Sequence, residues 1–242
     1  MDYHDMLAHI GAGSAHPGGF AATLNFLAHF PIETGAKVLE VGCGTGQTAS
    51  YLAENGCDVT ALDIRPKMVE KAKKRAQKRG LQINFVEGNV TSLPFEEDQF
   101  DVLLGESVTV FVDIPAALKE YYRVLKPEGR LLDREIMAMK PIPKEMEEAI
   151  KDLYGAGKLP TLEEWISHIQ SSGFEEAEVW NPISMADDML HLIANFDDPE
   201  LAEKPDPKTY KDIVEIRRKN QWLLSKYEEY HGYGVFMGIK PE

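Results

Sequence analysis

The sequence is short of cysteine and of long apolar runs, and each shortage argues against a class of protein. Its two cysteines, Cys43 and Cys57, have no second cysteine or histidine at metal-ligand spacing, so we expect no metal site. Cys43 falls inside a glycine-rich turn and Cys57 just before an expected strand, which argues against a disulfide. No apolar run approaches the length of a membrane helix, and the N-terminus lacks a signal-peptide pattern, so we expect a cytoplasmic protein without membrane association.

Positive charge is also scarce, because 26 basic residues face 40 acidic ones and the formal net charge is −14. Binding to nucleic acid depends on neutralising phosphates, so we do not expect a nucleic-acid partner. The basic strip from Lys67 to Lys78 is interleaved with apolar residues at helical spacing, which indicates a solvated helix face. The length of 242 residues suits one α/β domain with a small cap.

What the sequence does contain is a glycine-rich turn between Val38 and Thr48, with glycines at positions 42, 44 and 46. Glycine adopts positive φ and lets the backbone approach a ligand, and the following helix start offers unpaired N–H groups. The turn therefore suits a nucleotide-like or carboxylate-bearing ligand. It does not match the dinucleotide fingerprint, because Gln47 stands where the third glycine would be. By itself, it is equally compatible with an ordinary tight turn.

Strands and helices alternate through the first half of the chain. Strands are expected at 37–42, 58–63, 82–87, 100–106 and 130–136, and helices at 48–55, 66–79 and 115–125. This alternation predicts an α/β fold with an open, doubly wound parallel sheet. Before it, we expect a short helix over 2–10 and a second helix that starts at Pro17. That second helix has an apolar stripe of Phe20, Leu24, Leu27 and Ala28.

After Pro141 the alternation stops. Helices are expected at 145–154 and, after the capping box that starts at Thr161, up to residue 172, with a strand at 174–180. Residues 181–231 read as an insertion with two helices, and a last strand follows at 233–240. The first of these helices has an apolar face of Met189, Leu192, Ile193 and Phe196. The second starts at Asp206-Pro207 and buries Ile213, Leu223 and Tyr227.

The spacing Glu40-x-Gly42-x-Gly44-x-Gly46 resembles the first motif of class I S-adenosylmethionine (SAM)-dependent methyltransferases. The runs 93–95, 100–103 and 122–129 are similar to the ubiquinone-biosynthesis-type (methyltransferase type 11-like) branch, and 161–174 is a weaker match. The resemblance covers about residues 36–136. The chain departs from the pattern at Asn89, where the family usually has Asp, and at Glu128, where it usually has Gly. The chain also departs from the family pattern at the insertion 181–231, where family members usually have a tight hairpin.

The resemblance implies a Rossmann-like, seven-stranded, mostly parallel sheet with the last strand antiparallel. It also implies SAM as cofactor, S-adenosylhomocysteine as product and a small-molecule methyl acceptor. We expect one domain over 1–242, with an N-terminal helical lid at 1–30, a cofactor-binding core at 36–136 and the helical insertion at 181–231. The lid and the insertion should together cover the site. The chain would be a monomer or a homodimer.

Cofactor-binding residues are expected at the carboxyl ends of the strands, where open α/β sheets bind ligands. Asp63 would accept hydrogen bonds from both ribose hydroxyls, although it could instead cap the helix that starts at Pro66. Ile64 and Met68 would sandwich the adenine, and Asn89 with Val90 would meet its edge. The remaining candidates lie on the glycine turn and on the end of the fourth strand: Glu40, Gly42, Cys43, Gly44, Gly46, Gly105 and Glu106.

Methyl transfer from a sulfonium is an in-line displacement, in which the enzyme aligns the acceptor and excludes water. A general base is needed only when the acceptor must lose a proton. Our catalytic candidates are Glu106, Glu135 and His16. Other side chains expected to face the acceptor are Ser107, Arg134, Tyr3, His4 and His9, although each histidine could equally be a surface or capping residue. Glu106 could instead form a structural pair with Arg134 on the next strand.

Two functions from other classes remain open on the sequence alone. A non-catalytic SAM-binding or regulatory module would share the glycine turn and the ribose-binding acid. A nicotinamide-dependent oxidoreductase would share the turn between the first strand and its helix. Serine hydrolase chemistry is not expected without a Gly-x-Ser-x-Gly elbow, and no phosphate-loop lysine follows the glycines. The acceptor is not identified by any of these residues.

Overall fold

The protein is described by a computed structural model that covers residues 1–188, 198 and 201–242. Seven strands form one sheet in the order β3-β2-β1-β4-β5-β7-β6, with β7 antiparallel to both of its neighbours. The predicted sheet, including its antiparallel last strand, is confirmed. The strands are β1 (Lys37–Val41), β2 (Asp58–Asp63), β3 (Asn84–Glu87), β4 (Phe100–Glu106), β5 (Leu125–Ala138), β6 (Glu175–Ser184) and β7 (His231–Ile239).

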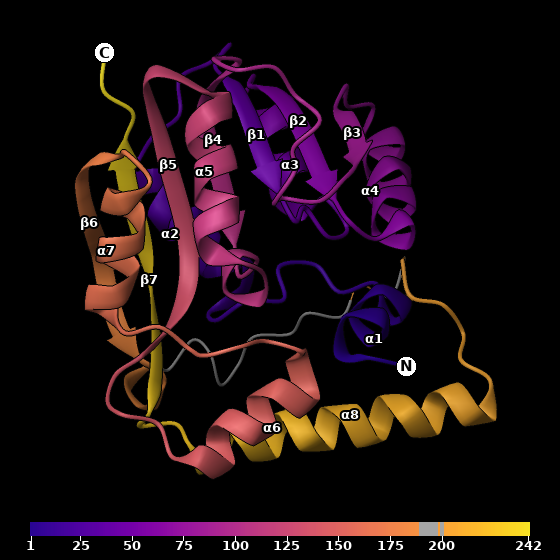
Figure 1. Cartoon of the computed structure of the whole chain (residues 1–242). Helices are drawn as coiled ribbons and strands as arrows, with labels where there is room; N and C mark the ends of the chain where they lie inside the picture. Colours follow the sequence, from indigo (N-terminus) through magenta and orange to yellow (C-terminus); the bar gives the residue numbers. More distant parts are fainter. Residues whose placement is uncertain (189–197, 199–200) are drawn as a thin grey trace.

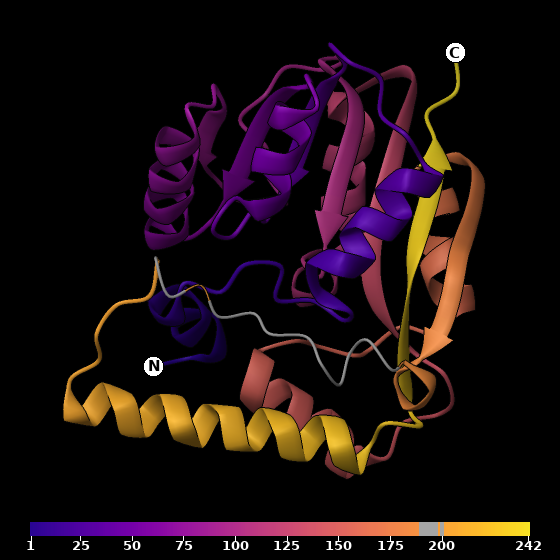
Figure 2. The same ribbon diagram turned by 180° about the vertical axis from the view of Figure 1, so that it is seen from behind.

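Helices cover both faces of the sheet, as expected when consecutive parallel strands are joined by right-handed crossovers (Figures 1 and 2). One face carries α2 (Gly19–His29), α3 (Gln47–Glu54) and α4 (Pro66–Arg79), and the other carries α5 (Ile114–Val124) and α7 (Leu162–Ser171). Strand residues such as Val38, Leu39 and Val41 are therefore wholly buried between the layers. The predicted capping box at Thr161 opens α7.

A third layer of helices, here called the cap, lies across the carboxyl edge of the sheet (Figures 1 and 2). It consists of α1 (Tyr3–Ile10), α6 (Lys144–Tyr154) and α8 (Pro207–Lys226), and α8 packs against both α6 and α1. As predicted, the α8 N-cap is Asp206, and Ile213, Leu223 and Tyr227 are buried. The other helix predicted in the insertion, with Met189, Leu192, Ile193 and Phe196, lies outside the described residues. Two short 3-10 turns, η1 (Thr109–Phe111) and η2 (Met185–Asp187), complete the described elements.

The predicted start of α2 was wrong, and of its predicted apolar stripe only Leu27 is buried. The helix begins at Gly19 rather than Pro17, because Gly18 takes a left-handed conformation (φ 74°) at the N-cap. Leu24 and Ala28 are exposed, and the buried face is instead formed by Ala22, Thr23, Phe26 and Leu27. The apolar stripe was misplaced because it left out Thr23, a polar residue that is buried through its hydrogen bond to Glu106.

The predicted solvated face of α4 was also wrong at two positions. Lys71 is only 5% exposed, and its Nζ donates to the backbone oxygens of Ala8 and His9 at the end of α1. Arg75 is also buried, and its Nε donates to the backbone oxygen of Thr45 in the glycine turn, 2.8 Å away. These cations replace water with carbonyl partners, which is why they are tolerated inside the protein.

Candidate active site

A cavity of about 360 Å³ lies between the carboxyl edge of the sheet and the cap. It opens beside the ends of β1 and β4, where the strand order reverses and open α/β sheets bind ligands. Among the predicted residues that line it are Glu40, Gly42, Cys43, Gly44, Asp63, Ile64, Met68, Asn89 and Val90. The lining also includes His4, His16, Glu106 and Ser107. Within the described part of the chain it does not include Gly46, Gly105, Glu135, Arg134, Tyr3 or His9.

The three glycines of the turn have different tasks, although all have positive φ (63°, 53° and 74° for Gly42, Gly44 and Gly46). A Cβ on Gly42 would lie 2.2 Å from Val108, and one on Gly46 would lie 2.9 Å from Ala72 on α4. A Cβ on Gly44 would meet no protein atom within 4 Å. Gly42 and Gly46 therefore permit close packing of the protein on itself, whereas Gly44 leaves its backbone bare towards the cavity.

Asp63 ties the glycine turn to the start of α4. Its Oδ2 accepts from the backbone N–H of Gly44 at 2.9 Å, and its Oδ1 accepts from that of Arg65 at 2.8 Å. Burial raises the pKa of the Asp63 carboxyl, and these two N–H groups oppose the rise. The N-cap residue of α4 is Arg65 rather than Asp63. The carboxylate lines the cavity and keeps lone pairs for further donors.

Glu40 places a second carboxylate in the cavity wall. Only 5% of the residue is exposed, and within the described chain its Oε2 has no hydrogen-bond partner. Burial raises the pKa of the Glu40 carboxyl well above its usual range, and the charge of Glu106 raises it further. A buried oxygen without a donor is costly, so this wall of the cavity suits a ligand that carries a cationic or hydrogen-bond-donating group.

Glu106 is held in one orientation by three side chains. Its Oε1 accepts from the Thr48 hydroxyl at 2.8 Å, and its Oε2 accepts from the Thr23 hydroxyl at 2.6 Å. The same Oε2 lies 3.1 Å from the His16 Nε2. In the described chain, Glu106 therefore contacts His16, which is charged only when protonated, and no ion pair joins Glu106 to Arg134. These contacts fix the orientation of the carboxylate on the cavity wall.

Both ring nitrogens of His16 are engaged by protein groups. Besides the contact with Glu106, Nδ1 lies 3.3 Å from the backbone oxygen of Pro17. Burial lowers the pKa of His16, while the charge of Glu106 acts in the opposite direction. Arg134 supports the same segment, because its Nη2 donates to the Pro17 oxygen at 2.6 Å. Protein oxygens therefore lie within 3.3 Å of both ring nitrogens of His16.

Glu135 and Gly105 lie behind the cavity wall. Glu135 is fully buried, and its Oε1 accepts from the backbone N–H groups of Val108 and Thr109 at 2.7 and 2.6 Å. A Cβ on Gly105 would lie 2.5 Å from Asp133 Oδ1, so this glycine makes room for Asp133. Asp133 in turn accepts from the Thr109 hydroxyl, and burial raises its pKa to about 7. The two acids therefore hold η1, whose residues form part of the cavity wall.

The cavity is also lined by apolar and aromatic residues that we did not predict: Leu7, Val108, Phe111, Val112 and Tyr154. The predicted His4 packs edge-on against Phe111 with ring centroids 5.0 Å apart, and the predicted Tyr3 packs similarly on Tyr154 at 4.8 Å. Tyr154 ends α6, which we expected as a helix but did not connect with the site. No described residue of 181–231 lines this cavity; α8 reaches it only through α1 and α6.

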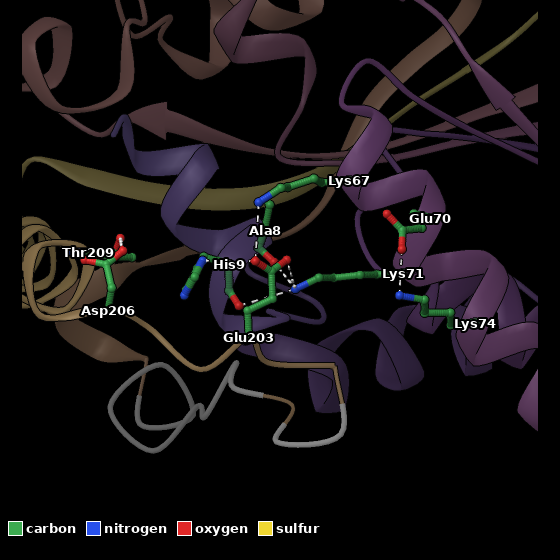
Figure 3. Close-up of polar contacts among 9 residues, drawn as sticks. All are labelled: Ala8, His9, Lys67, Glu70, Lys71, Lys74, Glu203, Asp206 and Thr209. Carbon is green, nitrogen blue, oxygen red and sulfur yellow. Dashed lines mark hydrogen bonds and ion pairs between the residues drawn. The ribbon is translucent and has the colours of Figure 1, made fainter.

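A charged cluster, here called the Glu203 clamp, joins the cap to the core (Figure 3). The Glu203 carboxylate lies 3.3 Å from each of His9 Nδ1, Lys67 Nζ and Lys71 Nζ. The backbone N–H of Glu203 also donates to the His9 oxygen at 2.9 Å. A segment far along the chain thus holds the end of α1 against α4, next to the cavity.

Replacing Glu203 with Gln should loosen α1 without unfolding the core. Its ion pairs are partly exposed, so we expect a local effect below about 1 kcal/mol and amide exchange in α1 that is roughly two- to fivefold faster. Hydrogen exchange with mass spectrometry measures this, and Glu215→Gln, which breaks the exposed Arg218 pair on α8, is the matched control. Unchanged exchange in α1 would show that the clamp does not hold the cap.

Comparisons with known proteins agree with this geometry. A methyltransferase domain model matches residues 39–133. The uncharacterized methyltransferase YodH of Bacillus subtilis (strain 168) is 34% identical over 238 residues, which span 98% of this chain and 99% of the relative. The ubiquinone/menaquinone biosynthesis C-methyltransferase UbiE of Bartonella henselae is 34% identical over 163 residues, spanning 65% of this chain and 62% of that protein.

Among solved structures, Haemonchus contortus phosphoethanolamine N-methyltransferase 2 in complex with SAM superposes with a TM-score of 0.77. It is 22% identical and covers 98% of this chain and 57% of that chain, so it shows a shared fold. Fold, cavity and relatives together define an enzyme that uses SAM as cofactor. The chain belongs to the class I SAM-dependent methyltransferases.

This membership confirms the resemblance found over residues 36–136, and the nicotinamide and non-catalytic alternatives are set aside. No helix in the described ranges is both long enough and apolar enough to cross a membrane.

Proposed function

We propose that the protein transfers the methyl group of SAM by in-line displacement to a small molecule held under the cap. The observation that carries this proposal is one cavity whose wall combines two unlike sets of residues. One set, here called the cofactor end, is the bare backbone of Gly44 and the carboxylates of Glu40 and Asp63. The other set, here called the aromatic end, is the side chains of Phe111 and Tyr154. The names of UbiE and of the phosphoethanolamine enzyme indicate small-molecule chemistry in those proteins, which supports a small acceptor here.

The residues of the cofactor end fit the functional groups of SAM. The cofactor supplies an electrophilic methyl group on a sulfonium. The open space at Gly44 lets the backbone approach the cofactor closely, and the unpaired Glu40 oxygen suits its ammonium group. Asp63 accepts from the ribose hydroxyls. In this assignment, the Glu40 oxygen that has no partner and the free lone pairs of Asp63 are the groups that bind the cofactor.

Two apolar side chains are available for the adenine. Ile64 is 60% exposed although it lies on the cavity, and Met68 is buried beside it. At the adenine edge, the Asn89 Oδ1 already accepts from the N–H and hydroxyl of Thr91, so the side-chain NH₂ is the group that faces a ring nitrogen. A donor here replaces the acceptor that aspartate provides in the family.

The acceptor would approach from the aromatic end, with Glu106 beside the reacting centre. The cap excludes water and the fixed carboxylate orients the acceptor or removes its proton. His16, Thr23 and Thr48 hold that carboxylate, and Glu135 holds the turn that forms the facing wall. In this proposal Glu106 touches the ligands, whereas His16 and Glu135 are positioning residues.

The ribose assignment is tested by replacing Asp63 with Ala. Removing a charged acceptor loses at least about 1.5 kcal/mol, so we expect the dissociation constant of S-adenosylhomocysteine to rise roughly tenfold or more. Isothermal titration calorimetry measures it. Asp58 lies at the opposite end of the same strand and is exposed, so Asp58→Ala should bind like the wild type. Equal affinity in Asp63→Ala and the wild type would refute the assignment.

A further inference from the structure

A second, smaller cavity of about 40 Å³ lies behind the aromatic end of the first. It is lined by η1, β5, α6, α8, the loop after α6 and the start of β7. Its wall includes the apolar side chains of Val110, Ile136, Met146, Ile150, Leu159 and Leu223, with His231 as a polar member. A wall that is mostly apolar favours apolar groups, because a polar group would lose hydrogen bonds there.

The two cavities share two lining residues in the described chain, Phe111 and Tyr154. Their ring centroids are 6.1 Å apart and their planes are inclined by 58°. Tyr154 is anchored at its far end, where its hydroxyl donates to Asn220 on α8 at 2.5 Å. Burial raises the pKa of Tyr154 well above its usual value, so the hydroxyl keeps the proton that makes this bond. The anchored Tyr154 ring and the Phe111 ring, which can turn about its χ angles, therefore separate the aromatic end of the first cavity from the apolar cavity.

We infer that the methyl acceptor carries an apolar extension, such as an alkyl or alkenyl chain, which passes between Phe111 and Tyr154 into the second cavity. This inference rests on the proposed function, because it places the reacting atom of the acceptor in the first cavity. The occupant is the acceptor itself rather than a separate ligand, since Phe111 and Tyr154, which the two cavities share, form the aromatic end of the first cavity. A volume of 40 Å³ holds about three groups of the size of a water molecule or a methylene.

The cap helices thereby determine which acceptor is used. Ile150 and Tyr154 come from α6 and Leu223 and Leu224 from α8, whereas the glycine turn, Glu40 and Asp63 come from the core. Changes in the cap would then alter acceptor length without altering cofactor affinity. This separation makes the inference testable without knowledge of the natural acceptor.

The probes are phenol and its 4-ethyl, 4-butyl and 4-hexyl derivatives, titrated into wild-type protein saturated with S-adenosylhomocysteine. Each methylene that enters the apolar cavity should raise affinity about fourfold, until the cavity is filled. Ala156 lines only the second cavity, so Ala156→Leu should stop the increase at a shorter chain and leave phenol binding unchanged. Leu224 lines it from α8 and is only partly buried, so Leu224→Ala should extend the increase to a longer chain.

Ala21→Leu on the exposed face of α2 is the matched control and should behave as the wild type. Melting temperatures and the dissociation constant of S-adenosylhomocysteine show that each variant is folded. Affinity that does not depend on chain length, or that depends on it equally in all four proteins, overturns the inference. Failure of the proposed function looks different. The wild type would still bind S-adenosylhomocysteine and the longer phenols, but it would not transfer the methyl group of SAM to any acceptor in the panel.

Discussion

Replacing Glu106 with Gln is expected to lower turnover at saturating cofactor by about 10²–10⁴-fold, the range associated with loss of a general base. The carboxylate lines the cavity at the end of β4 and accepts from Thr23 and Thr48 on its two oxygens. An amide keeps the size of the side chain but removes its charge and turns one acceptor into a donor. The fold should survive, because the threonine hydroxyls can rotate to accept from the new NH₂ group.

The measurement is release of S-adenosylhomocysteine in a coupled assay, first with a panel of metabolites and then with the acceptor it identifies. The matched control is Asp101→Asn at the amino end of the same strand. Asp101 is bonded to the Lys37 N–H and to Lys126, far from the cavity, so its loss should affect stability only. A Glu106→Gln enzyme with full turnover would remove this residue from the mechanism, and a large fall in melting temperature would assign it a structural role.

Replacing Gly44 with Leu should raise the dissociation constant of S-adenosylhomocysteine by up to roughly 100-fold. The new side chain would point into space that the protein leaves empty and the cofactor needs, and forcing such an overlap costs up to about 3 kcal/mol. The substitution also carries backbone strain, because Gly44 has a φ of 53°.

Gly80→Leu separates the two effects. Gly80 ends α4 with a φ of 68°, and a Cβ there would also meet no atom within 4 Å. Both variants should lose a similar 1–2 kcal/mol or so of stability from the left-handed backbone, but only Gly44→Leu should lose cofactor binding. Thermal melting and calorimetric titration of both proteins decide the matter. Comparable affinity in the two variants would mean that the cofactor does not approach the backbone at Gly44.

Much of the fold could be predicted from the sequence because its determinants are local. Apolar strands that alternate with capped helices predicted the sheet, and the glycine turn with Asp63 predicted where the cavity lies. The local sequence pattern predicted burial wrongly where a residue bonds to a partner far away in the sequence. Thr23 is polar, yet it is buried because Glu106, 83 residues away, accepts its hydrogen bond. Lys71 reads as a surface cation, yet it is buried because α1 presents two carbonyl oxygens to it.

The sequence by itself therefore determined the class of fold, the glycine turn beside the cavity and the candidate acids, since strand period, helix caps and glycine conformations depend on neighbouring residues. Only the tertiary structure decided which acid faces the cavity. Glu106 and Glu135 both lie near the carboxyl ends of adjacent strands, but the first lines the cavity and the second bonds the backbone of η1. Tyr154 and Phe111 likewise meet only through packing of the cap on the core, because no local pattern encodes the contact of residues 43 positions apart.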